Sequence, residues 1–204
     1  CFNNVRVPIS QRTAHKGYRV DECLNLLEKG FGWKIKDRSM VFVEEYERIE
    51  LPFKRKLGNF GSTVIGIHTC TREMEVRGWD KWVELCNYLI KQGHYLVFTG
   101  GEADVYRVSE LVDKLDNRSR VEIMLGKDWN YTANLLKKLD LFITINTGIM
   151  HLAVTLNVPT VAIISGSPAE VVAPNKDNFK FVENHNIKDI EVSAVLNAIK
   201  EILK

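Results

Sequence analysis

The segment 144–154, TINTGIMHLAV, joins an apolar run to a helix through a short polar turn. The turn consists of Asn146, Thr147 and Gly148, and His151 follows in the first turn of the helix. A helix that begins in this way presents unpaired backbone N–H groups and a partial positive charge. Gly148 lets a ligand approach the backbone closely, because glycine has no Cβ. The spacing of these residues therefore predicts an anion-binding site, for which a phosphate is the typical ligand.

A simpler interpretation is that a polar residue of the turn only caps the helix and that His151 is an ordinary, partly exposed histidine. For an isolated strand-to-helix junction this interpretation would be favoured. Three further polar loops, however, follow predicted strands at 68–79, 99–104 and 126–129. Because the carboxyl ends of parallel strands meet at one edge of a sheet, the loops are expected to converge with the turn, which favours ligand binding.

The converging loops supply further candidates. Arg72 and Arg77 carry guanidinium groups that clamp phosphate oxygens, although a loop arginine is more usually exposed to solvent. Glu102 can accept hydrogen bonds from ribose hydroxyls, or it can simply favour the start of a helix. Trp79 and Trp82 are expected in the core. The chain has no G-x-G-x-x-G, G-x-S-x-G, H-E-x-x-H or D-x-D motif, which disfavours metal-assisted and nucleophilic hydrolysis.

The elements that must position these residues follow from the apolar pattern between residue 62 and the C-terminus. Nearly continuous apolar strands that alternate with amphipathic helices are typical of a parallel sheet covered on both faces. The sequence therefore predicts an α/β fold with a doubly wound, Rossmann-like parallel sheet. Strands are expected at 62–68, 94–100, 120–125, 141–146, 160–166 and 179–183, and helices at 79–93 (closed by Gly93), 103–115, 130–139 (capped by Asn130), 147–157 and 192–204.

Residues 1–57 have a different pattern, with one helix expected at 18–32 and one strand at 39–45. So few elements cannot form a core alone. We therefore expect residues 1–57 to be the tail of an N-terminal domain or an extension that packs on the main domain. Residues 58–204 are expected to form the Rossmann-like domain.

The composition excludes several classes of protein. A hydrophobic content of 45% argues against disorder, and a net charge of +2 gives no indication of nucleic-acid binding. The four cysteines have no C-x-x-C spacing, so a reduced, cytoplasmic setting fits better than a zinc site or a redox pair. The charge-free segment 141–169 is divided by polar residues and Pro159 into pieces too short to span a bilayer.

Two segments carry a resemblance to a known family, GIHTCTREMEVRGWDKWVELCNYLIKQGHYLVFTGGEADV and LGKDWNYTANLLKKLDLFITINTGIMHLAVTLNVPTVAIISGSP. Over residues 62–174 the chain resembles the donor-binding half of glycosyltransferase family 9, the ADP-heptose:lipopolysaccharide heptosyltransferases. The resemblance implies a GT-B architecture, in which residues 58–204 bind the nucleotide sugar and residues 1–57 end the acceptor-side domain. It also implies metal-independent, inverting transfer from an ADP-linked sugar without a cofactor.

The resemblance assigns roles to individual residues. Thr71 and the pair Thr147 and Gly148 would hold phosphate. His151 matches a histidine that lies near the diphosphate in the family, and Glu102 would face the ribose.

Two positions depart from the usual family pattern. Arg77 stands where the family usually has lysine, and Asn146 stands where it usually has an aspartate that contacts the sugar. The resemblance further implies that the catalytic base lies upstream of this chain.

The partners implied by the resemblance are a nucleotide-sugar donor and a glycan or glycolipid acceptor, without nucleic acid. The acceptor would bring the cytoplasmic protein to the inner face of the membrane as a peripheral protein. Two alternatives stay open, a GT-B-like nucleotide-sugar epimerase or hydrolase and a non-catalytic nucleotide-binding module. The amide of Asn146 argues against the epimerase, which relies on additional carboxylates, and favours the module.

Overall fold

The computed structural model describes residues 28, 34, 63–166 and 168–203. Apart from residues 28 and 34, the predicted N-terminal unit, its helix at 18–32 and its strand at 39–45 lie outside the described residues. The predicted boundary at residue 57 lies outside them as well, so this division of the chain stays a prediction.

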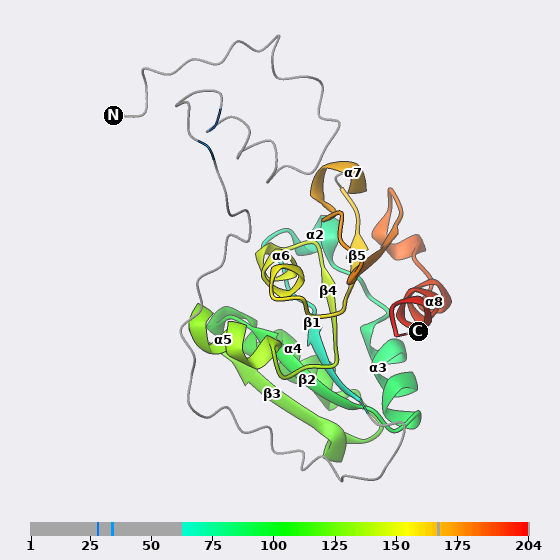
Figure 1. Ribbon diagram of the computed structural model, residues 1–204. Helices are drawn as coiled ribbons and strands as arrows, with labels where there is room; N and C mark the ends of the chain where they lie inside the picture. The colour runs from blue at the N-terminus through cyan, green and yellow to red at the C-terminus, as the bar shows by residue number, and fades with distance from the viewer. Residues whose placement is uncertain (1–27, 29–33, 35–62, 167, 204) are drawn as a thin grey trace.

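A six-stranded sheet forms the centre of the fold, with strand order β3-β2-β1-β4-β5-β6 and parallel pairing throughout (Figure 1). The order reverses between β1 and β4, and a reversal of this kind opens a crevice at the carboxyl ends of the two strands. The predicted doubly wound α/β fold is confirmed. The strands are β1 (Val64–His68), β2 (Tyr95–Gly100), β3 (Val121–Leu125), β4 (Leu141–Ile145), β5 (Thr160–Ile164) and β6 (Phe179–Glu183).

The helices of the described residues cover both faces of the sheet, as Figure 1 shows for α5 and α6 on one face and for α3 and α8 on the other. None of them is long and apolar enough to cross a membrane. The helices are α2 (Met74–Arg77), α3 (Trp82–Lys91), α4 (Val105–Asp113), α5 (Trp129–Leu136), α6 (Gly148–Thr155), α7 (Ala169–Val172) and α8 (Val192–Ile202), with short 3-10 helices at η2 (Glu102–Asp104), η3 (Arg118–Arg120) and η4 (Ile187–Asp189).

The alternation of side chains along the strands builds two main core layers. Ile65 and Ile67 of β1 pack into the layer formed with α3, α4 and α8, whereas Val64 packs into the layer formed with α5 and α6. Every residue of β1, β4 and β5 is buried, because helices cover both sides of these central strands. The near absence of charge in their sequences follows from this burial.

The tryptophans of the first helical segment confirm the expectation of a core role. Trp79 and Trp82 are each 3% exposed, and their rings meet edge to face with centroids 5.2 Å apart. Trp79 Nε1 donates a hydrogen bond to the Ile190 carbonyl at 2.9 Å. Gly93, which was expected to close the helix, has a φ of 93° just beyond its end.

The cap of α5 differs from the prediction. The helix begins at Trp129, and Asp128 is its N-cap residue, with a side-chain oxygen that accepts the Tyr131 N–H at 2.7 Å. The assignment of the cap to Asn130 was therefore wrong, because that residue already lies inside the first turn. The loop predicted at 68–79 also contains the short helix α2, which the sequence did not indicate.

Replacing Asp128 with alanine removes the acceptor for the Tyr131 N–H. We expect the free energy of unfolding to fall by about 1 kcal/mol, the usual loss for an N-cap. Asn130→Ala is the matched control and should change this free energy by less than about 0.5 kcal/mol. Urea denaturation followed by circular dichroism measures both, and equal losses would contradict the role of Asp128.

Candidate functional site

The turn between β4 and α6, formed by Asn146, Thr147 and Gly148 and called here the β4–α6 turn, is fixed on both sides. It follows the fully buried β4, and α6 buries Ile149 and Ala153 against the sheet. Within the turn, Asn146 is buried, Thr147 is half-buried and Gly148 is exposed. The turn therefore reaches the surface at a position that the core determines.

The N-terminus of α6 has no side-chain cap. Thr147 is the N-cap residue and has extended backbone angles, but no side chain accepts a hydrogen bond from the first turn of the helix. The Thr147 hydroxyl instead donates to the Ile145 carbonyl at 3.4 Å. The capping hydrogen bond that the simpler interpretation requires is thus not formed, in contrast to the Asp128 cap of the adjacent α5. The Met150 N–H donates to the Thr147 carbonyl at 3.1 Å, and the N–H groups of Gly148 and Ile149 before it are left for solvent or a ligand.

Gly148 opens the space in front of these N–H groups. A Cβ at this position would meet a single neighbouring atom within van der Waals range, Cη2 of Trp129 at 3.9 Å. An anion could therefore approach the backbone at Gly148, with the indole of Trp129 along one side of the space.

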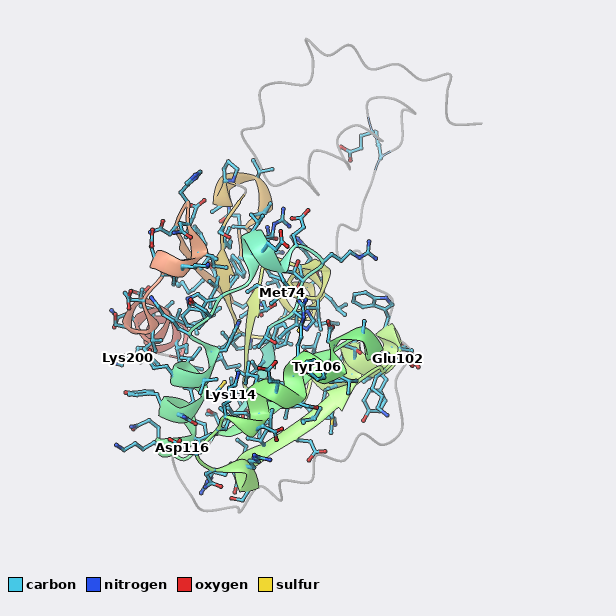
Figure 2. The ribbon with its side chains drawn as sticks, turned by 180° about the vertical axis from the view of Figure 1, so that it is seen from behind. Met74, Glu102, Tyr106, Lys114, Asp116 and Lys200 are labelled. Atoms are coloured by element: carbon cyan, nitrogen blue, oxygen red, sulfur yellow. The ribbon has the colours of Figure 1, made fainter. Side chains whose placement is uncertain are left out.

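Glu102 lies at the carboxyl end of β2, next to the end of β3 (Figure 2). It contacts Gly126, where a Cβ would lie only 2.8 Å from Cγ of Glu102. Gly126 also has a φ of 67°, a conformation that favours glycine. This glycine consequently brings the exposed carboxylate of Glu102 close to the chain that leads to α5.

Arg77 lies at the opposite end of the same edge, beside the loop that follows β5. A Cβ at Gly166 would lie 3.7 Å from Nε of Arg77, and the Ser165 hydroxyl donates to the Val76 carbonyl at 3.2 Å. Nε of Arg77 is 2.9 Å from a carboxylate oxygen of Glu73, although its N–H does not point at that oxygen well enough to form a hydrogen bond. The guanidinium thus has a charged neighbour while one buried donor stays unsatisfied.

All seven predicted site residues follow or adjoin strands at the carboxyl edge. These seven residues extend along the edge from β2 to β5, a distance of three strand spacings or roughly 14 Å. Arg72, in contrast, is exposed in the loop after β1. Glu102 follows β2, Thr71 follows β1, Asn146, Thr147, Gly148 and His151 follow β4, and Arg77 lies beside the loop after β5.

The family model of glycosyltransferase family 9 (heptosyltransferase) matches residues 11–198. The chain belongs to this family. No curated protein sequence matches it.

Solved structures with a similar fold include members of the same family. Heptosyltransferase WaaC of E. coli with ADP has a TM-score of 0.66 and 16% identity over 93% of this chain and 58% of that chain. The E. coli ADP-heptose LPS heptosyltransferase II has a TM-score of 0.63 and 21% identity, over 69% and 46% of the two chains. A family 9 glycosyltransferase of Veillonella parvula gives 0.64 and 21%, over 70% and 46%. The chain thus spans about half the length of these structures.

His68 is a residue at the carboxyl edge of the sheet that the sequence did not single out. It ends β1 in a buried position, and its Nδ1 lies 3.0 Å from the Thr99 carbonyl of β2. Because a carbonyl oxygen only accepts, this nitrogen carries the hydrogen. Burial lowers the pKa of His68, against the opposing effects of the Thr99 carbonyl and the Asp104 carboxylate. A neutral His68 therefore joins the ends of β1 and β2 just before Thr71.

His151 is the fourth residue of α6, and its side chain is half-buried. Burial also lowers the pKa of His151, so the ring is neutral at neutral pH. A neutral imidazole near the β4–α6 turn can still donate one hydrogen bond to an anion. No group of three or more His, Cys, Asp or Glu within the described residues could hold a metal ion.

Three buried or half-buried histidines, His68, His94 and His151, make the stability depend on pH. Burial lowers the pKa of each below 6.5 in the folded chain, so the unfolded chain binds more protons than the folded chain when the pH falls below 6.5. The stabilisation is complete above pH 6.5 and is lost as the pH falls through the lowered pKa values of the folded chain. We expect the free energy of unfolding, measured with urea, to be lower at about pH 5 than at about pH 7.5.

His68→Asn tests the contribution of the buried ring, because asparagine keeps an N–H donor toward Thr99 but does not titrate. The variant should lose less stability between about pH 7.5 and about pH 5 than the parent chain. A parallel pH dependence in His68→Asn and the parent chain would rule out this role of His68.

Proposed function

We propose that this chain binds the donor of a glycosyltransferase that moves a sugar from a nucleoside-diphosphate sugar to a cell-surface glycan acceptor. The observation that carries the proposal is the uncapped N-terminus of α6 at the reversal of strand order, with Glu102 and Arg77 on either side of it. The reaction is heptosyltransferase-like, inverting and independent of metal. It requires no cofactor beyond its nucleotide-sugar substrate.

The diphosphate is assigned to the β4–α6 turn and its neighbours. Backbone N–H groups at the start of α6 and the hydroxyl of Thr71 donate to phosphate oxygens. The hydroxyl of Thr147 turns from the Ile145 carbonyl to donate to them as well. His151 adds a neutral donor beside them. Glu102 accepts hydrogen bonds from the ribose hydroxyls. An ADP-linked donor is supported by the similar heptosyltransferase WaaC, whose structures contain ADP and ADP-2-deoxy-2-fluoro heptose.

The transfer step is a direct displacement. An acceptor hydroxyl attacks the anomeric carbon, the bond from that carbon to the diphosphate oxygen breaks, and its electron pair stays on the diphosphate. A base N-terminal to the described residues takes the hydroxyl proton. Negative charge grows on the leaving diphosphate, and the α6 N–H groups and Arg77 stabilise it where it develops. One such donor commonly lowers the barrier by about 3 kcal/mol.

The acceptor sets where the reaction takes place. A glycan carried on a membrane lipid would hold the protein at the cytoplasmic face of the membrane as a peripheral protein. The donor site itself needs only soluble nucleotide sugar, so donor binding can be tested without a membrane.

A thermal-shift panel of ADP, UDP, GDP and CDP with their sugars tests the donor class. At about 100 times its dissociation constant, a ligand that binds only the folded chain stabilises it by about 2.7 kcal/mol, or roughly 5–10 °C for a chain of this size. We expect ADP and ADP-sugars to give this shift both with and without EDTA. A shift with UDP alone would contradict the ADP-linked donor, and the absence of any shift would contradict the proposed function.

Gly148→Asp places a carboxylate at the exposed head of α6, in the space assigned to the diphosphate. We expect the loss of detectable ADP binding in isothermal titration calorimetry, because like charges repel at that point. The melting temperature should stay close to that of the parent chain, since a carboxylate at a helix N-terminus is favourable.

Gly148→Asn is the matched control, because asparagine has the shape of aspartate without its charge. It should keep measurable ADP binding that is weaker than in the parent chain. Unchanged ADP affinity in Gly148→Asp would refute the assignment of the diphosphate to this turn.

A further inference from the structure

Trp129 is the residue at the donor edge that the proposed function leaves without a role. Its side chain is 66% exposed, although an indole is among the largest apolar surfaces that a residue can bury. A single exposed aromatic residue is common on protein surfaces. The position of this one is specific, because Cη2 of Trp129 is the atom that a Cβ at Gly148 would meet, at 3.9 Å. The ring therefore stands beside the turn assigned to the diphosphate.

The backbone of Trp129 is held in place although its ring is exposed. Trp129 is the first residue of α5, and Asp128 caps that helix. Nearly two turns further on, Leu135 and Leu136 pack in the same core layer as Ile149 of α6. The helices α5 and α6 are neighbours on this face of the sheet (Figure 1), and Cη2 of Trp129 lies beside the β4–α6 turn.

The residues at the two ends of the carboxyl edge, Glu102 and Arg77, set the direction in which the donor would lie along it. Glu102, assigned to the ribose, contacts Gly126, only three residues before Trp129. Arg77 lies beside the loop after β5, on the other side of the β4–α6 turn. Consider a nucleoside diphosphate with its ribose at Glu102, after β2, and its diphosphate at Gly148, after β4. Its base then lies toward the end of β3, from which the chain leads to Trp129.

We propose that the indole of Trp129 stacks on the nucleoside base of the donor, an inference that rests on the proposed function. Every nucleobase has a planar face, and stacking on an exposed aromatic ring strengthens binding of the base. The ligand class is thus a nucleoside diphosphate, and not a diphosphate alone. Trp79 and Trp82 are each only 3% exposed and are not available for this contact.

The test compares ADP with inorganic pyrophosphate, which has the two phosphates and no base. For Trp129→Ala, we expect the dissociation constant for ADP to rise about tenfold or more, the usual effect of removing a stacked aromatic residue. The dissociation constant for pyrophosphate should stay within about twofold of the parent value. Isothermal titration calorimetry measures both.

Two further variants keep the test specific. Trp129→Phe retains an aromatic face and should restore most of the ADP affinity, while the quenching of tryptophan fluorescence by ADP should disappear. Tyr106→Ala removes an even more exposed aromatic residue, 78% exposed, from α4, and it should change neither dissociation constant.

The outcomes separate this inference from the proposed function. An equal loss of ADP and pyrophosphate binding in Trp129→Ala would mean that the indole only shapes the phosphate site, and it would overturn the stacking proposal. Unchanged ADP affinity in Trp129→Ala would overturn it as well. If the parent chain bound neither ADP nor pyrophosphate, the proposed function itself would fail.

Discussion

The site depends on one constraint, the burial of α6 against the sheet while its N-terminus stays uncapped. Ile149 and Ala153 hold the helix in the core, so its first N–H groups cannot turn away from the carboxyl edge of the sheet. The strand order places this N-terminus at the reversal between β1 and β4, where the connections of the described residues leave the two strands in opposite directions. A fixed, unsatisfied set of donors favours an anionic ligand, because binding it requires little reorganisation of the protein.

Much of the fold could be predicted because strands that are buried on both faces of the sheet consist almost entirely of uncharged, mostly apolar residues. The charge-free runs of β4 and β5 indicated central strands, and β6 was predicted at its observed bounds, 179–183. The short helix α2 was not predicted, because its four residues bury nothing and so show no apolar periodicity. The cap of α5 was misplaced because Asp128 and Asn130 are both good cap residues, and the local sequence does not decide where the helix begins.

The candidate site was predictable to the extent that it is local. The β4–α6 turn is contiguous in sequence, and its strand-to-helix pattern indicated an anion site without any tertiary information. His68 was missed because its role depends on the Thr99 carbonyl, 31 residues away on the neighbouring strand. Trp129 was not singled out because its position beside Gly148 depends on how α5 and α6 lie relative to each other, which the sequence of neither helix shows. Residues that act through contacts between distant segments leave no pattern in the sequence.

The amide of Asn146 affects the two halves of the proposed reaction in opposite ways. The residue is buried next to the β4–α6 turn, where an ionised carboxylate would lose hydration and would repel the bound diphosphate. A neutral amide avoids both costs and so favours retention of the donor. When the bond to the diphosphate breaks, however, positive charge grows on the sugar ring, and a carboxylate near that ring would stabilise it. In the proposed reaction, asparagine at this position therefore favours donor binding over stabilisation of the transition state.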